Sequence, residues 1–233
     1  MYETSQLYRS ILSNPLHVKE IKLEVAGAEY TEANIISASI PPSGLYEKFG
    51  IGNCVSRELD IDVRPIETIP RHAEIKVFLR LVLEDQASEW IPQGVFYISG
   101  RRKGSETGSV AITAYDAMLQ AEAVWLNEEY DEENWPMSEA DAVEDIAYRM
   151  GVEVDARTAL SGTFPVDYPV DENGDLTMRE VLSGIAVSNA GNWVITSEGK
   201  LLLIGAVDLP EETYHLVSSD GDAIVFGGVR IYV

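Results

Sequence analysis

The chain has 233 residues, and its 17 basic and 39 acidic residues give it a formal net charge of −22. A protein this acidic is not expected to coat the phosphates of nucleic acid, or to be held on an anionic membrane by charge. Hydrophobic residues make up 45% of the sequence, which is enough to build a core. The length corresponds to one or two domains.

The negative charge is concentrated in the second half of the chain. Residues 1–120 hold 16 acids and 12 bases, whereas residues 121–233 hold 23 acids and 5 bases. Such asymmetry favours two bodies with different surroundings. We therefore predict one domain over residues 1–120 and a second, acidic domain over residues 121–233.

Cysteine content and hydropathy predict where the protein is made. Cys54 is the single cysteine, so no disulfide forms within the chain, which suits a reducing compartment. The first ten residues lack the basic and apolar regions of a secretory signal. Apolar stretches such as 201–204 are far shorter than the roughly 20 residues that span a bilayer. We expect a soluble protein made in the cytosol.

The first half of the chain is predicted to be mostly β. A short amphipathic helix over residues 2–13 comes first. Six candidate strands follow, at 21–25, 36–40, 59–63, 75–83, 95–98 and 110–114, and most of them place apolar residues at every second position. Such strands have one apolar and one charged face, which is typical of an antiparallel sheet. With no long helix before residue 116 to cover them, they are expected to form a small barrel or sandwich.

Helix signals dominate after Tyr115. Asp116 is placed to cap a short helix, and Ser138 to cap a longer one that ends at Gly151. Thr177 and Glu180 have the spacing of a capping box, which predicts the start of a third helix.

Strand signals return at the end of the chain. Residues 192–196 and 201–204 read as a hairpin, and 214–217 and 224–233 as two further strands. The predicted fold class is therefore α+β and β-rich: an N-terminal antiparallel β-barrel or sandwich, followed by a smaller α+β domain with two main helices and a β-hairpin.

Catalytic signatures are missing from the sequence. The three histidines are far apart and none has a metal-ligand spacing. A Cys54–His72 nucleophile pair can be drawn, but a small buried cysteine explains the same residue. Residues 49–53 hold half of a dinucleotide loop without its third glycine, and predict a loop between strands. We predict a protein that is not an enzyme, with no catalytic residue and no cofactor.

One segment partly matches a twelve-residue calcium loop. In residues 169–180, the candidate ligands are Asp171, Asn173 and Glu180. The first ligand position is a proline, no helix precedes the segment, and Glu180 is needed for the capping box. A turn leading into a helix explains the same residues, so we predict no metal site and keep calcium as the alternative.

Two further residue sets are predicted to be structural. The one basic cluster, 101–103, has no interleaved aromatic residues and is expected to be a solvated hairpin turn. The four tryptophans, at 90, 125, 135 and 193, are scattered over both halves. They are expected to pack in cores and between domains rather than to form a sugar-binding platform.

Several short motifs resemble tail proteins of bacteriophages and prophages. Three in the first half resemble the N-terminal domain of baseplate hub and tail-tip proteins, and those in the second half resemble the helix–hairpin unit of late-control-D-type hubs. They occur in a consistent order at residues 14–18, 89–98, 113–119, 135–138, 143–151, 177–182, 190–195 and 199–203. Together they cover most of residues 2–205.

The resemblance implies a structural protein of the virion. Such hubs are homotrimers at the tail tip that join the tail tube to the spike and form part of the DNA conduit. The implied partners are other tail proteins, namely a tube or distal tail protein and a spike or tip. DNA would be met only in transit, and no membrane anchoring is implied. The protein would be synthesised in the host cytoplasm, and residues 212–233 would begin a second barrel.

Two alternatives remain open at the level of the sequence. The chain could be a tail module that binds a receptor or the host cell wall. It could also be the non-catalytic N-terminal part of a tail-associated peptidoglycan hydrolase.

Overall fold

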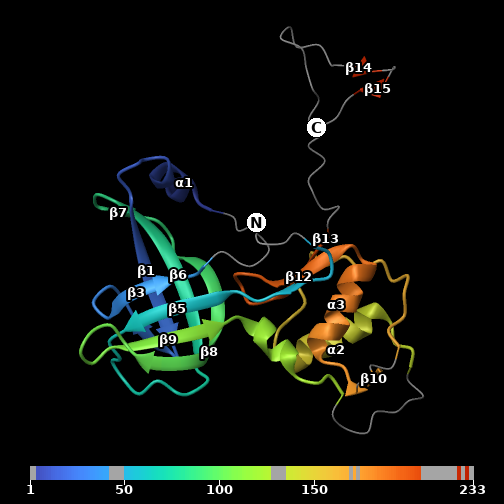
Figure 1. Cartoon of the computed structure of the whole chain (residues 1–233). Helices are drawn as coiled ribbons and strands as arrows, with labels where there is room; N and C mark the ends of the chain where they lie inside the picture. The colour runs from blue at the N-terminus through green and yellow to red at the C-terminus, as the bar shows by residue number, and fades with distance from the viewer. Residues whose placement is uncertain are drawn as a thin grey trace.

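The computed structural model describes residues 4–41, 50–126, 135–167, 170–171, 174–205, 225–226 and 229–230. The chain forms two bodies side by side, one made of strands and one of helices and strands (Figure 1). The fold is therefore α+β and rich in strands, as predicted.

The first body is an eight-stranded antiparallel sheet that curls into a nearly closed barrel (Figure 1). Its strands lie in the order β2-β1-β6-β8-β9-β5-β3, and β7 pairs with β6. Their bounds are β1 Val18–Val25, β2 Ala28–Tyr30, β3 Ile35–Ser39, β5 Glu58–Val63, β6 Glu74–Leu83, β7 Gln86–Ala87, β8 Ile91–Lys103 and β9 Val110–Tyr115. All six strands predicted from alternation are confirmed, whereas β2 and β7 were not predicted.

The barrel core follows directly from the alternation in the sequence. Leu23 of β1 lies opposite Val77 of β6, and Ile61 of β5 lies opposite Ile112 of β9. All four side chains are buried. Burying a side chain of this size stabilises the fold by about 1.5–3 kcal/mol. The barrel therefore has its own continuous apolar core.

The outer face of the barrel carries charged residues and one tryptophan. Trp90 lies against the Lys22 ammonium, 5.5 Å from the ring centre, and against the Arg80 guanidinium at 4.5 Å. Arg80 also pairs with Glu20 at 2.7 Å. Trp90 therefore has a surface role rather than the core or domain-packing role expected for it.

The basic cluster is part of a strand and not a turn. Arg101, Arg102 and Lys103 continue β8 and pair with β9, beyond a register shift between Ile98 and Gly100. Alternation ends at this shift, and the polar side chains beyond it remain exposed, so periodicity gave no signal for the longer strand. The turn itself lies at residues 104–109.

A short helix, α1 (Gln6–Leu12), packs on the barrel through the buried Ile11. The hydroxyl of Ser5 accepts a hydrogen bond from the Tyr8 N–H at 3.0 Å, so the helix begins four residues later than the predicted start at residue 2. The Ser5 hydroxyl also donates to the Glu89 carboxylate at 2.6 Å, which fixes the helix to the barrel.

The second body packs helices against a three-stranded sheet of order β13-β12-β4. Its elements are β4 Cys54–Val55, the 3₁₀ helix η2 Ala117–Glu122, α2 Glu139–Met150, α3 Met178–Ser188, β12 Gly191–Ile195 and β13 Leu201–Gly205. The predicted caps are confirmed at Asp116, Ser138, Gly151 and Thr177. The predicted hairpin is β12–β13.

Two small hairpins complete the described elements. Strand β10 (Val170–Asp171) pairs with β11 (Gly174–Asp175), and β14 (Val225–Phe226) pairs with β15 (Val229–Arg230). The predicted strand at 214–217, and most of the predicted start of a second barrel at 212–233, lie outside the described residues.

Tryptophans organise the core of the second body. Trp125 and Trp193 are fully buried, and Trp135 packs edge-on against Trp125 with 5.5 Å between ring centres. The predicted core role of these three is confirmed. The cluster also includes Ala117 and Met118 of η2, so the chain enters the second core directly after β9.

Candidate functional site

Main-chain pairing joins the barrel segment before β5 to the second body. β4 runs parallel to β12, with Cys54 opposite Trp193. The Trp193 N–H donates to the Asn53 carbonyl at 2.8 Å, and the Asn53 N–H donates to the Asn192 side chain at 2.8 Å. Residues 50–53 form no strand, in agreement with the loop predicted there, and β4 directly after them is a strand of the second body's sheet that was not predicted.

A buried carboxylate lies where the chain passes from one body to the other. Asp116 accepts hydrogen bonds from the Ser56 hydroxyl at 3.1 Å, the Arg57 N–H at 2.9 Å and the Met118 N–H at 3.1 Å. Burial raises the pKa of the Asp116 carboxyl above its usual range, although these donors and the Arg57 charge act in the opposite direction. Asp116 thus caps η2 and fixes the segment between β4 and β5 at the same time.

The Arg57 side chain spans the two bodies. Its guanidinium donates to the Gln93 carbonyl in the barrel at 2.9 Å and to the Thr196 carbonyl in the second body at 3.3 Å. It also lies over the Phe96 ring, 5.5 Å from its centre. An arginine can hold several acceptors in one plane in this way because its donors form a rigid fork.

A second arginine holds β4 from the side of α3. The guanidinium of Arg179 donates to the carbonyls of Cys54 and Met118 and forms an ion pair with Glu122. It therefore connects α3 to both β4 and η2. These contacts make the junction a network of charged side chains bonded to main-chain carbonyls.

The Cys54 thiol is not arranged as a nucleophile. It points to the Arg179 carbonyl at 3.6 Å, while His72 is exposed in the turn before β6. Burial raises the pKa of the thiol to about 12. The structure thus does not bring Cys54 and His72 together.

The calcium candidates are only partly described. The side chain of Asp171 and the whole of Asn173 lie outside the described residues. The Glu180 carboxylate accepts hydrogen bonds from the Thr177 N–H and hydroxyl, both at 2.8 Å, as the capping box predicts. Among described residues, no three His, Cys, Asp or Glu side chains come together as a metal site.

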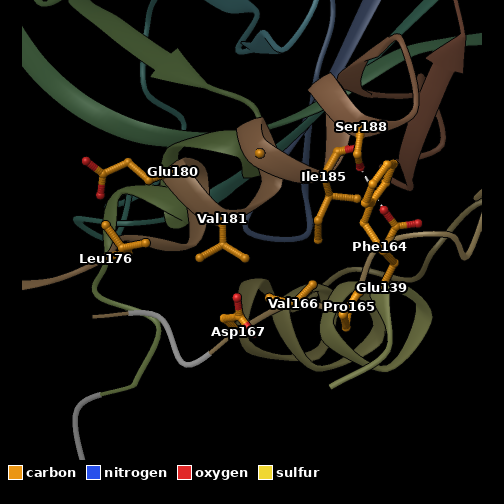
Figure 2. A pocket seen from close by; sticks show the side chains of 11 residues that line it. Glu139, Phe164, Pro165, Val166, Asp167, Leu176, Glu180, Val181, Ile185 and Ser188 are labelled. Atoms are coloured by element: carbon orange, nitrogen blue, oxygen red, sulfur yellow. Dashed lines mark hydrogen bonds between the residues drawn. The ribbon is translucent and has the colours of Figure 1, made fainter. Parts of the chain in front are cut away.

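A groove runs along α3 on the second body (Figure 2). Its volume is about 300 Å³. Val181 and Ile185 of α3 form the floor, and Phe164 and Val166 face them from the opposite wall, with Leu176 at one end. Phe164 is 56% exposed, which is unusual for a large apolar side chain. The groove is thus a mainly apolar, solvent-accessible concavity.

The opposite end of the groove is fixed by Glu139, the first residue of α2. Its buried carboxylate accepts hydrogen bonds from the Ser188 hydroxyl at 2.7 Å, the Gly162 N–H at 3.1 Å and the Asn189 amide at 3.2 Å. Its position in the first turn also suits the helix dipole. Glu139 therefore connects the groove wall to the end of α3, and its carboxylate has a structural role.

Sequence reasoning missed three of these charged residues, Arg57, Arg179 and Glu139. One signal was available. Arg179 lies in the first turn of α3, where the helix dipole disfavours a cation, so a partner outside the helix was to be expected. Nothing in the local pattern marked the other two, because their partners are distant in sequence.

The described geometry supports binding and assembly better than chemistry. The junction carboxylates and guanidinium groups are used in contacts between elements, and the groove is lined mainly by carbon. No described helix is long and apolar enough to cross a membrane.

Similarity to known proteins is found by comparing structures and not by comparing sequences. No protein-family model and no curated protein matches the chain. The 43 kDa tail protein of prophage MuSo2 from Shewanella oneidensis matches with a TM-score of 0.51 and 14% identity, over 81% of this chain and 56% of that one. The tail protein from Neisseria meningitidis MC58 matches with a TM-score of 0.48 and 14% identity, over 85% and 54%.

The chain therefore spans about half the length of these two solved structures. At 14% identity, the likeness to the MuSo2 protein is one of fold. The resemblance to phage tail proteins that the sequence motifs predict is confirmed at that level.

Proposed function

We propose that the protein is a structural component of a bacteriophage or prophage tail, at the baseplate hub or tail tip, where it links the tail tube to the spike. The observation that carries the proposal is the fold shared with the MuSo2 tail protein over 81% of this chain. The order of the sequence motifs supports the same class of protein independently of the fold comparison.

The architecture suits assembly with other tail proteins. Strands β2 and β3 end the barrel sheet, and no other described strand pairs with their outer edges. Open edges of this kind are sites where neighbouring chains add strands. The junction network holds the two bodies together, so that a hub could transmit load from one to the other. We infer a homotrimer whose neighbours are a tube or distal tail protein and a spike or tip.

The charge distribution suits a conduit that DNA passes without adhering. The second half carries most of the negative charge, and like charge keeps a nucleic acid from binding to a surface. In this role the protein is a virion component that is not an enzyme and meets DNA only during transit.

The test is to locate the protein on assembled tails. Antibodies raised against the purified chain are applied to tails from the phage or prophage that encodes it, and gold label is imaged by electron microscopy. Label at one end of the tail, with none on tails from a deletion strain, is the expected result. Label along the tail shaft, or none on intact and partly disassembled tails, would refute the hub position.

Two assays on the purified chain distinguish the hub from the alternative roles. A zymogram on peptidoglycan and a pull-down on purified host cell walls should both be negative for a hub. A clear zone would indicate a hydrolase, and wall binding would indicate a recognition module.

A further inference from the structure

A helix-interior glycine opens the floor of the groove. Gly184 lies in α3 between Val181 and Ile185, and a Cβ atom placed there would meet no other atom within 4 Å. Its φ is not in the left-handed region, so the backbone does not require glycine. Glycine inside a helix is destabilising relative to alanine. Neither backbone nor packing within the described residues explains it, whereas an occupant of the groove would.

The groove lies in the second body, where the basic side chains near it already form ion pairs. The four bases at 149, 157, 179 and 200 each form an ion pair with a described acid. The charged residues that line the groove are all acidic, namely Glu139, Asp167 and Glu180. The chemistry that fits is an apolar side chain with basic side chains near it.

The barrel of this same chain presents such a surface. Ile66 is 52% exposed on the loop that follows β5. The Arg101 guanidinium donates to the Ile69 carbonyl at 2.7 Å, which holds this loop against the end of β8. Arg102 and Lys103 are exposed at this end of β8, where the Arg102 charge also acts on the Asp62 carboxylate, and Glu67 beside Ile66 is an exposed acid on the same loop. We call Ile66, Arg102 and Lys103 the basic end of the barrel.

We propose that the groove along α3 binds the basic end of the barrel of a second copy of this chain. Ile66 enters beside Gly184, and Arg102 or Lys103 lies near Asp167. Because the two surfaces differ, the contact is head to tail, and repeated contacts of this kind close into a ring when the rotation permits. The contact presupposes the multi-copy assembly proposed above and identifies the surfaces that form it.

The first experiment measures the mass of the full chain in solution by sedimentation equilibrium, from micromolar to millimolar concentration at low and high salt. We expect the mass to rise above the 25.7 kDa of a single chain as the concentration rises. A mass of one chain under all conditions would overturn the contact, while labelling of tails would still decide the proposed function.

The second experiment fills the groove. Gly184→Met places a side chain in it, and we expect at least a tenfold loss in association constant. Gly184→Ala adds one carbon where the occupant would lie and should weaken association by a smaller factor than Gly184→Met does. Circular dichroism and melting curves of both variants verify the fold. Unchanged association of a folded Gly184→Met variant would exclude the groove.

The third experiment reverses charges. Asp167→Lys and Arg102→Glu should each weaken association about tenfold, and an equimolar mixture of the two single variants should regain it at the contact where both reversed residues meet. Glu144→Lys, at an exposed acid of α2 outside the groove, is the matched control and should weaken it much less. Failure of the mixture to associate better than either variant would overturn the choice of partner surface.

Discussion

The barrel and the second body bury their apolar residues in different ways. In the barrel, every second residue of most strands enters the core, and β6, β8 and β9 pair in chain order, although β1 pairs with the distant β6 and β5 with the distant β9. In the second body, helix faces enclose two tryptophans, and the sheet is complete only with a strand from residues 54–55. Both bodies thus contain pairings between distant segments, but the main strands of the barrel carry a local alternating pattern, whereas the short strand that completes the second sheet carries none.

The largest expected effect tests the role of the buried tryptophans. Trp193→Ala removes a fully buried ring whose N–H donates to the Leu182 carbonyl at 2.8 Å, and should cost about 3–5 kcal/mol of unfolding free energy. Trp90→Ala, on the barrel surface, should cost about 1 kcal/mol. Urea denaturation followed by circular dichroism measures both. Equal losses would contradict the distinction between the two positions.

The next effect concerns the reactivity of Cys54. With a thiol pKa of about 12 in place of 9, the thiolate fraction near pH 8 falls about a thousandfold relative to the unfolded chain. Alkylation of the native protein by iodoacetamide should slow by about ten- to a thousandfold, because the greater nucleophilicity of a high-pKa thiolate offsets part of this loss. Its rate should rise about tenfold per pH unit from 8 to 10, while the rate in urea levels off near 9.

Mass spectrometry follows this modification cleanly, because the chain has a single cysteine. A native rate close to that of the unfolded chain would mean that the thiol is ionised and accessible, and would reopen a nucleophilic role.

The junction should be more sensitive than the barrel to loss of a carboxylate. Asp116→Ala leaves the N–H groups of Arg57 and Met118 without their acceptor, and should cost about 2–3 kcal/mol. The matched control is Asp60→Ala in β5, which loses one hydrogen bond from the Thr113 hydroxyl and should cost about 0.5–1 kcal/mol. Chemical denaturation compares them, and a smaller loss for Asp116→Ala would show that the junction is not held by this residue.

The smallest expected effect is a gain in stability. Gly184→Ala should stabilise the protein by about 0.5–1 kcal/mol, because alanine is the better helix former and its Cβ meets no other atom. Gly199→Ala, at a turn with φ of +81°, should destabilise it by about 1 kcal/mol. Melting temperatures measure both. A destabilised Gly184→Ala variant would mean that the glycine has a packing role after all.

The sequence predicts the barrel better than the junction, for a physical reason. Alternation between apolar and polar residues marks most of the longer barrel strands, and capping residues such as Ser138 and Thr177 are local signals. A two-residue strand such as β4 has no periodicity, and its partner Trp193 is far away in sequence. Pairing of this kind is visible only when the fold is known.

The candidate sites, too, can be predicted only in part from the sequence. Absence of a metal-ligand spacing and of a nucleophile motif can be read from the order of residues. The groove cannot, because Phe164 and Val181 approach each other only after α2 and α3 have packed. Glu139 looks like an ordinary first-turn acid in the sequence, although it is a buried acceptor for three donors.

The parallel pairing of β4 with β12 has a consequence during synthesis. The bonded residues Asn53 and Asn192 are 139 positions apart, and a ribosome adds about 5–20 residues per second. The segment around Cys54 therefore leaves the ribosome roughly 7–30 s before its partner strand exists. In that interval the barrel can close. The main-chain groups of residues 53–55 that later pair with β12, however, have no partner within the chain. Until translation ends, this unpaired edge is therefore open to contact with other nascent chains.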